Sequence, residues 1–478
     1  MMTDAEGKEF ALAGFERFFS RCDGMSYKIA HVMGITGSVE KIIANAPEAF
    51  CAVINANPRM RATQKRENPS NATIKPQIEL KEAASLIKVM DNIDWMRHVE
   101  EECEKPFDRY VNFPYHLSIL KCDEPNFLRI VLFSDHYMSD GFSGLIVLHQ
   151  LLEQITSKKE THLYPLRPPI HSHIVKKSRF LRGMENMLKR LLMPFITREI
   201  QSLEPVLPVH SEVEDFNLCE ENAKPNPSFA LFNNGSPENL SKALTRCREE
   251  RVTLHGPAIV CAVICLYVTK FQESVGNQKS MKISLDVDYN MRKFIKPKYE
   301  EDTVGFNVAM STLEYLKESG VSVTSKFWDE ARKAKKKTDS AVGSLIMRLS
   351  LQYINDDIKR PPFPKKSKNI RIRKATMGDV NISNLGKYPY SRKHEFSDSS
   401  GDKLEIKDLH LYNSSPSLGP LLIIFLTSVD AVGYSLCHRM EKATAETFFR
   451  KYVRLMEAIG EIGMNEKISD VCQKVSRF

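Results

Sequence analysis

The chain has 478 residues, of which 42% are hydrophobic and 9% aromatic, so it carries enough apolar side chain to build more than one core. This composition excludes a chain that is mainly disordered. At about 150 residues per domain, the length allows two or three domains, of which we expect two. The formal net charge of +8 is small for this length, and no stacking aromatic motif accompanies the basic residues, so we expect no nucleic acid partner.

The amino terminus predicts a cytoplasmic protein. Its first residues, MMTDAEGKEFALAGFERFF, include acidic side chains and no apolar core of signal-peptide length, and no window supplies the roughly 18 apolar residues of a membrane span. The ten cysteines form no Cys-x-x-Cys pair. We therefore expect reduced, mostly buried thiols, and neither a zinc module nor a disulfide framework.

The first part of the chain, residues 1–162, alternates strand-like and helix-like segments, which is an α/β pattern. The expected elements are a strand over Ser26–Ile35, a helix over Val39–Asn55, strands over His116–Leu120 and Leu128–Phe133, and a helix over Leu145–Ile155. Apolar residues of the last helix fall on one face, so we expect it to pack onto the sheet.

Residues 163–228 form a proline-rich crossover between two halves, with eight prolines from Pro165 to Pro227. Within it, residues 176–196 combine an apolar stripe with six basic side chains. Two interpretations stay open for this amphipathic basic helix. It packs on its own domain, or it binds the surface of a membrane or lipid droplet without crossing it.

The second half, residues 229–478, again mixes elements. We expect helices over Glu238–Glu249 and Pro257–Phe271, a strand over Lys282–Val287, a β-hairpin formed by Leu421–Thr427 and Val432–His438, and a closing helix over Ala443–Ile462. Its size and mixed content match those of the first half, which favours two copies of one sandwich fold. The basic stretch Lys359–Lys374 is either a solvated loop or a docking surface for a phosphorylated ligand or an acidic carrier.

The sequence DHYMSDGFSG at residues 135–144 carries the strongest functional signal. It places His136, Asp140 and Gly141 directly after the apolar run Ile130–Phe133 and before a helix. An imidazole can accept a proton near neutral pH, a carboxylate four residues on can lock the local backbone, and a glycine leaves room for a substrate. This pattern predicts a general base on a loop.

Two other chemistries are not supported. A metal site needs three or more ligands, whereas His136 and Asp140 lack a nearby third, and His171 with His173 lies in the proline-rich crossover. A nucleophile elbow would need glycine at position 145, where Leu145 stands. We therefore expect no metal, and we expect Ser143 to cap the following helix.

The motif resembles the active-site motif of the coenzyme A-dependent acyltransferase superfamily, which includes chloramphenicol acetyltransferase, alcohol O-acetyltransferases, phthiocerol dimycocerosyl transferases and peptide-synthetase condensation domains. Four further segments are similar to family segments in the same order and at similar spacing. They are residues 57–61 (NPRMR), 287–292 (VDYNMR), 304–307 (VGFN) and 381–386 (NISNLG). The resemblance covers about residues 14–460.

The resemblance implies two chloramphenicol acetyltransferase-like two-layer α/β sandwich domains, with the active site in a channel between them. It implies that His136 is the general base, that Asp140 points away from substrate and pairs with Arg292, and that Gly141 allows close approach of the thioester. Asn384, or a hydroxyl near it, is the implied candidate for donating to the oxyanion.

Further residues of the similar segments are candidates for lining the substrate channel: Tyr137, Ser143, Gly305 and Asn307. Gly305 and Asn307 equally fit a turn near the channel. The implied co-substrate is acyl-CoA, with no permanently bound cofactor, and we expect a monomer.

Asp135 stands where condensation domains and wax ester synthases usually carry the first of two histidines, which favours the single-histidine branches. The Asp-Phe-Gly-Trp-Gly motif of the plant branch is missing from the sequence. The first hypothesis is therefore transfer of an acyl group from acyl-CoA to an acceptor hydroxyl or amine. A free-standing condensation-type domain that uses carrier-protein thioesters is one alternative, and a non-catalytic relative that binds lipid or a partner is the other.

Overall fold

A computed structural model describes most of the chain. The described residues are 6–20, 25–158, 161–174, 204–217, 225–271, 279–294, 302–342, 371–398 and 400–478, with the single positions 183, 187, 191, 344 and 347. Most of the expected amphipathic helix at 176–196 and of the basic stretch at 359–374 lies outside them. No helix in the described part combines the length and the apolar character that crossing a membrane requires.

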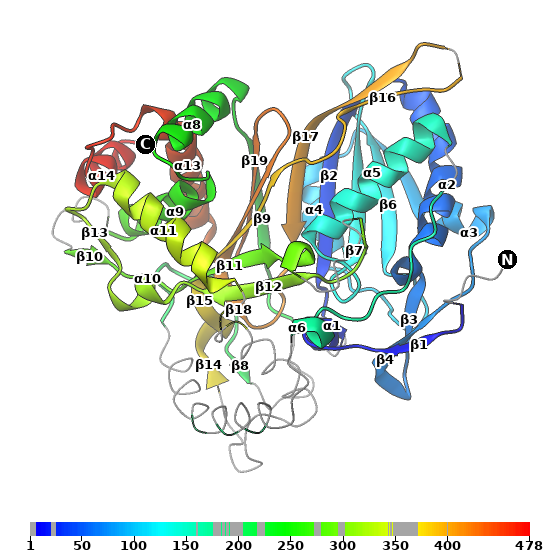
Figure 1. Ribbon diagram of the computed structural model, residues 1–478, viewed down its shortest axis with the longest axis horizontal. Coiled ribbons are helices and arrows are strands. Elements are labelled where there is room, and N and C mark those ends of the chain that lie inside the picture. Colours follow the sequence, from blue (N-terminus) through cyan, green and yellow to red (C-terminus); the bar gives the residue numbers. More distant parts are fainter. Residues whose placement is uncertain are drawn as a thin grey trace.

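Two six-stranded sheets stand side by side (Figure 1). The first has the order β16 (Lys393–Glu395), β17 (Lys403–Asn413), β2 (Lys28–Thr36), β7 (Phe127–Asp135), β6 (Tyr115–Lys121) and β5 (Ile87–Asp91). The second has the order β12 (Val308–Thr312), β11 (Leu285–Asn290), β15 (Thr376–Lys387), β18 (Gly419–Ser428), β19 (Val432–His438) and β9 (Phe229–Asn234). The predicted architecture of two α/β units is confirmed.

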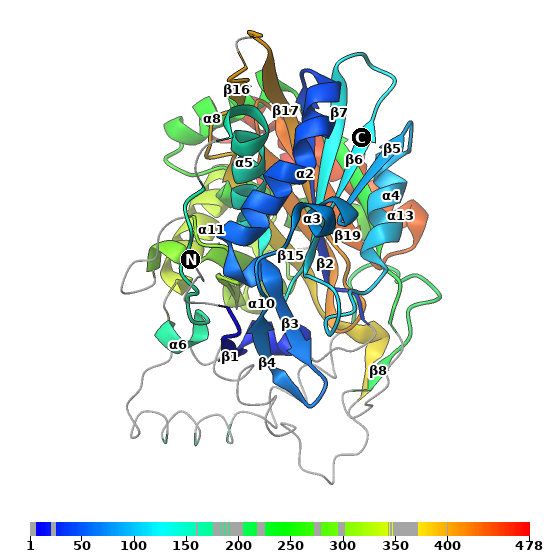
Figure 2. The same ribbon diagram turned by 90° about the vertical axis from the view of Figure 1, so that its right-hand side faces the viewer.

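Helices cover the outer face of each sheet (Figures 1 and 2). In the first half these are α2 (Val39–Ala56) and α5 (Gly141–Ser157), whose apolar faces join the core of the first sheet. In the second half they are α8 (Pro237–Glu249), α9 (His255–Phe271), α11 (Phe327–Ala341), α13 (Lys442–Glu457) and α14 (Ile468–Ser476). Helix α9 is apolar on all sides because other helices and the sheet surround it.

A third apolar core joins the two halves. It includes Val131 from the first sheet, Phe232, Phe425 and Cys437 from the second, and Leu411 of β17. Helix α4 (Trp95–Cys103) contacts both β2 and β9. The halves therefore share buried apolar side chains along β17, β18 and β9.

The two sheets do not divide the chain at a single point, as the predicted halves do. Strands β16 and β17 lie within residues 229–478, yet β17 pairs antiparallel with β2 along Ile29–Thr36. The chain thus leaves the second sheet after β15, adds two strands to the first sheet, and returns as β18. This crossover was not predicted, because strand pairing over long sequence separations leaves no local pattern.

Most expected elements appear close to their predicted bounds, including the β18–β19 hairpin. The strand expected over Lys282–Val287 lies at Leu285–Asn290 instead, where apolar residues face the helices and polar ones face away. The closing helix ends at Glu457 rather than Ile462. There Gly460 lies so close to α8 that a Cβ would come within 2.7 Å of Lys242 Cβ, and the chain turns.

Shorter elements complete the fold, and Figure 2 shows several of them below the first sheet. The remaining strands are β1 (Glu9–Ala11), β3 (Ala62–Lys65), β4 (Asn68–Ile74), β8 (Phe216–Asn217), β10 (Ser280–Met281), β13 (Val321–Ser322) and β14 (Arg371–Ile372). The remaining α-helices are α1 (Phe15–Ser20), α3 (Leu80–Ser85), α6 (His171–Ile174) and α10 (Glu314–Glu318).

Candidate active site

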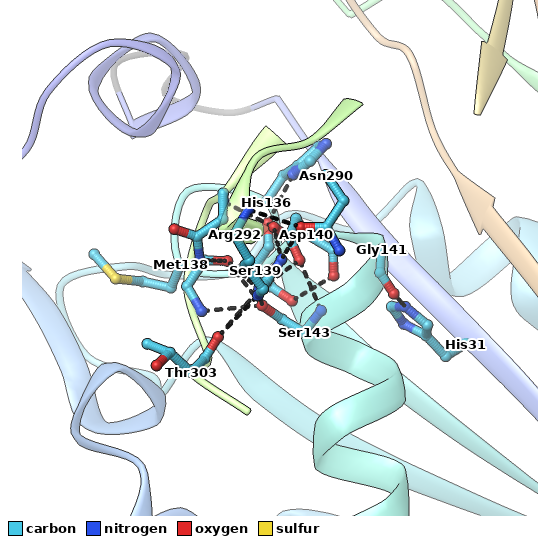
Figure 3. A network of polar contacts seen from close by, with 12 residues as sticks. His31, His136, Met138, Ser139, Asp140, Gly141, Ser143, Asn290, Arg292 and Thr303 are labelled. Carbon is cyan, nitrogen blue, oxygen red and sulfur yellow. Dashed lines mark hydrogen bonds and ion pairs between the residues drawn. The ribbon is translucent and has the colours of Figure 1, made fainter. Parts of the chain in front are cut away.

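The motif at residues 135–144 forms the connection between β7 and α5, at the junction of the two halves (Figure 3). Strand β7 ends at Asp135 and α5 begins at Gly141. Asp140 is the N-cap of α5, because its Oδ1 accepts a hydrogen bond of 2.7 Å from the backbone N–H of Ser143. The prediction that Ser143 caps this helix is therefore wrong: a carboxylate at the N-cap satisfies the helix end and complements its dipole.

The imidazole of His136 is held in one tautomer. The ring nitrogen Nδ1 lies 2.8 Å from the carbonyl oxygen of Ser139. The backbone N–H of His136 donates to the carbonyl oxygen of Tyr27 at 3.0 Å. A carbonyl only accepts, so Nδ1 carries the proton and Nε2 carries the lone pair. Nε2 is therefore the atom of His136 that can take a proton from another group.

Aromatic rings pack on both sides of this imidazole. Phe19 from α1 stacks on His136 with 4.4 Å between ring centroids and 9° between planes, and Phe306 lies at 5.1 Å. Burial lowers the pKa of His136, although the Ser139 carbonyl and Asp140 act in the opposite direction. The base is thus neutral at physiological pH. Phe19 was missed in the sequence, where the only signal was an aromatic-rich segment over residues 15–19.

The structure brings Asp140 and Arg292 together. Both terminal guanidinium nitrogens of Arg292 donate to the carboxylate, Nη1 to Oδ2 at 3.0 Å and Nη2 to Oδ1 at 3.1 Å. The side chain of Asp140 is 0% exposed and that of Arg292 is 2% exposed. Burial acts to raise the pKa of Asp140, but Arg292 and two backbone N–H donors hold it below its ordinary value. Asp140 is thus a permanent anion whose oxygens are all engaged.

Three of the candidate channel residues tie the two halves together. The Ser143 hydroxyl donates to the Gly305 carbonyl at 2.7 Å and accepts from the Gly305 N–H at 3.0 Å and from Arg292 at 2.8 Å. The N–H of Asn307 donates to Asp140 at 2.7 Å. Gly305 has a φ of +153° and lies against Arg59, so only glycine fits there. The fourth candidate, Tyr137, is buried and donates to Ala62 at 3.1 Å.

Asp135, which replaces the first histidine of the double-histidine motif, has a partner of its own. Arg109 donates to its carboxylate from Nε at 2.6 Å and from Nη2 at 3.1 Å, and both side chains are at most 5% exposed. The same guanidinium lies 5.4 Å from the Tyr137 ring. The carboxylate of Asp135 thus anchors the start of the loop to Arg109.

Asn384 lies on β15, where its side chain contacts His255 and Gly386. Its amide nitrogen is 3.5 Å from Nδ1 of His255 at the start of α9, and its carbonyl oxygen accepts from Gly386 at 2.9 Å. The next residue, Leu385, is the one that approaches Gly141. The expected donation from Asn384 to an oxyanion stays a prediction.

Comparison with known proteins supports this picture at the level of the fold. No family model matches the sequence, and no curated protein matches it. The structure is similar to the trichothecene 15-O-acetyltransferase TRI3 from Fusarium sporotrichioides, with a TM-score of 0.68 and 12% identity over 96% of this chain and 97% of that one. The first condensation domain of the calcium-dependent antibiotic synthetase gives a TM-score of 0.63 and 12% identity, over 97% and 99% of the two chains.

A third similar structure is the epimerization domain from the third module of tyrocidine synthetase B, with a TM-score of 0.57 and 11% identity over 96% and 99% of the chains. The chain has the chloramphenicol acetyltransferase-like fold. An acetyltransferase and a peptide-synthetase condensation domain thus resemble this chain in fold, each at 12% identity to it. The likeness in fold covers 96–97% of the chain. At such low identity it carries no chemistry, which must be argued from the site.

In this acyltransferase fold, no group of three or more metal-ligating side chains comes together among the described residues. The eight described cysteines form no disulfide. The polar groups around the motif include the imidazole of His136 and the buried ion pairs Asp140–Arg292, Asp135–Arg109 and Glu16–Arg59. Such a set can accept one proton and hold its own geometry.

Proposed function

We propose that the protein transfers an acyl group from an acyl-CoA thioester to an acceptor hydroxyl or amine, with His136 as the general base. The observation that carries this proposal is the fixed tautomer of His136, whose Nδ1 donates to Ser139 and leaves the Nε2 lone pair for a proton. A neutral, positioned imidazole contributes about 10²- to 10⁴-fold to such a transfer.

The proposed reaction needs no covalent enzyme intermediate. His136 Nε2 takes the proton of the acceptor while the acceptor oxygen forms a bond to the thioester carbonyl carbon. The tetrahedral intermediate then collapses, the carbon–sulfur bond breaks, and the coenzyme A thiolate takes the proton back from His136. Asp140 and Asp135 are each paired with an arginine, so neither carboxylate faces the developing oxyanion with an uncompensated charge.

A basic surface hollow in the second half suits the phosphates of coenzyme A. It has a volume of about 580 Å³ and is lined by Arg251, Arg332, Lys335, Lys336, Asp339 and Ser340. Arg332 and Lys335 also pair with carboxylates, to Glu250 at 2.7 Å and to Asp339. The lining carries four cations and one anion, and Glu250 and Asp329 pair with Arg332 beside it, so the hollow keeps a small excess of positive charge that suits a phosphate.

A series of contacts runs from the elements that line this hollow to the motif, through α9 and β15. The first turn of α9 packs against α11, where Gly256 leaves room for the backbone of that helix. The preceding residue, His255, meets Asn384 of β15. A Cβ on Gly141 would lie 3.3 Å from Leu385 of the same strand. A long donor such as acyl-CoA suits this arrangement, in which the hollow that we propose for its phosphates and the proposed base lie on different elements, with α9 and β15 between them.

The proposal is tested with a panel of acyl-CoAs and candidate alcohols and amines, by following thiol release with and without acceptor and identifying products by mass spectrometry. We expect acceptor-dependent thiol release that His136→Ala abolishes. His162→Ala, at an exposed position outside the site, is the matched control and should keep full activity. If no thioester is consumed with any acceptor, or if His136→Ala stays active, the proposed mechanism is excluded.

A condensation-type activity on carrier-bound thioesters is the second candidate, because a condensation domain superposes with a TM-score of 0.63. Turnover of one acyl group carried by coenzyme A, by pantetheine and by a carrier protein separates the two. We expect the kcat/KM of acyl-CoA to exceed that of acyl-pantetheine, and Lys335→Glu/Lys336→Glu to remove this difference. Preference for the carrier protein would favour the condensation-type activity. Binding of acyl-CoA or lipid without turnover would favour a non-catalytic relative.

A further inference from the structure

His31 lies in the middle of β2, on the face of the sheet that α5 covers. Its backbone pairs with Leu132 of β7 and Leu411 of β17, and its side chain is fully buried. The imidazole fills the space in front of Gly144, where an added Cβ would come within 2.0 Å of His31 Cε1. The ring therefore packs directly against the backbone of the first turn of α5.

One nitrogen of this ring has a partner. Nε2 of His31 lies 2.8 Å from the carbonyl oxygen of Gly141. Since a carbonyl accepts, Nε2 carries the proton, and the buried Nδ1 has no hydrogen-bond partner in the described part of the chain. Burial lowers the pKa of His31 to about 4, so the ring is neutral at physiological pH. The only N–H donor of this neutral ring therefore binds the carbonyl oxygen of Gly141, the residue that follows Asp140.

Three consecutive residues of the motif are held by three different side chains, one from the motif itself and two from elsewhere in the molecule (Figure 3). The carbonyl of Ser139 accepts from the ring of the proposed base, and the carboxylate of Asp140 is held by Arg292 from the second half. The carbonyl of Gly141 is held by His31 from β2. In Figure 3, Gly141 lies between His31 and Asp140. Each contact fixes a different point of one short stretch of backbone.

We propose that His31 is a positioning residue, which donates from Nε2 to the Gly141 carbonyl and so fixes the orientation of the His136 imidazole. The inference rests on the proposed function only in that His136 is the base. His31 itself is separated from the base by the motif backbone and does not act on the substrate. Because a misplacement of a reacting group by 1 Å can cost about 100-fold in rate, losing this contact lowers kcat rather than raising KM.

Two variants separate the hydrogen bond from the shape of the ring. His31→Phe keeps a planar ring without a donor, and His31→Gln keeps an N–H donor at similar reach. We expect His31→Phe to lower kcat by about 10- to 100-fold with little change in KM, and His31→Gln to recover most of that loss. Equal kcat in wild type and His31→Phe would overturn the proposal. The proposal would also be overturned if kcat fell in both variants only in proportion to the fraction of folded protein.

A measurement without turnover keeps this inference separate from the proposed function. In protein with ¹⁵N-labelled histidine, the His136 signals are assigned by their absence in His136→Ala. We expect them to show a proton on Nδ1 in wild type and in His31→Gln, and a mixture of tautomers in His31→Phe. An unchanged tautomer in His31→Phe would refute the positioning role. An ordered wild-type signal without any acyl transfer would instead refute the proposed function and leave the positioning role standing.

Discussion

Arg292 and Asp140 form a bidentate ion pair although they lie 152 positions apart in the chain. The carboxylate comes from the N-cap of α5 in the first half, and the guanidinium follows β11 in the second. Because both are buried, each charge depends on the other for compensation. The pair therefore couples the geometry of the motif to the docking of the two halves.

Removing one member of this pair should destabilise the protein strongly. We expect Asp140→Ala to cost about 3–5 kcal/mol in the free energy of unfolding, since it strands a buried guanidinium, with the lost N-cap adding about 1 kcal/mol. Urea unfolding checks this. The double variant Asp140→Ala/Arg292→Met should be more stable than Asp140→Ala alone. Additive losses would show that the two side chains are not coupled.

The sequence was sufficient to locate the motif and the α/β pattern, because both are local. A strand followed by a loop and an amphipathic helix shows in the spacing of apolar residues around His136. The family resemblance supplied Arg292 as the partner of Asp140. Spacing alone contains no such information, since the contact joins two segments that only the fold brings together.

The parts that were missed depend on long-range packing. Strand β17 has apolar residues at alternate positions, but a register shift between Ile406 and Asp408 breaks the alternation, and its pairing with β2 cannot be read locally. His31 stood inside a correctly expected strand. A polar residue on the buried face of a strand, with a glycine-containing helix to cover it, was the available signal for its role.

The Asp135–Arg109 pair should stabilise the loop that carries His136, and a histidine at position 135 should not replace it. Asp135→His removes the carboxylate that pairs with the buried Arg109, and we expect a loss of about 3–5 kcal/mol in the free energy of unfolding. The double variant Asp135→His/Arg109→Gln should recover part of it. Asp398→Asn, which breaks the exposed pair with Lys41, is the control and should change stability little. A stable Asp135→His would contradict the structural role of this pair.

Gly144 should tolerate no side chain. A Cβ there meets the His31 ring at 2.0 Å, so we expect Gly144→Ala to cost about 1–3 kcal/mol of stability through overpacking and to lower the rate. Gly463→Ala is the matched control, because its nearest neighbour would be Glu466 at 3.8 Å. His31→Ala should relieve the clash in a Gly144→Ala background. A double variant no more stable than the single one would mean that the two side chains do not compete for this space.

The pH dependence of the rate should report a base with a lowered pKa. Burial lowers the pKa of His136, so it stays neutral until the pH falls below the ordinary histidine value of about 6.5, and kcat/KM should fall only below that pH. Stability should fall in the same direction, because His31 and His136 bind protons more readily in the unfolded chain than in the folded one.

Burial also raises the pKa of Asp286 and of Asp288 on β11 to about 6, so these carboxyls titrate in the same range. The acid limb of kcat/KM should therefore be measured in Asp286→Asn and Asp288→Asn as well as in wild type, using only the pH range in which circular dichroism shows a folded chain. We expect the limb to persist in both variants and to move in His31→Phe. A limb that vanishes in either aspartate variant would assign it to that carboxyl instead of His136.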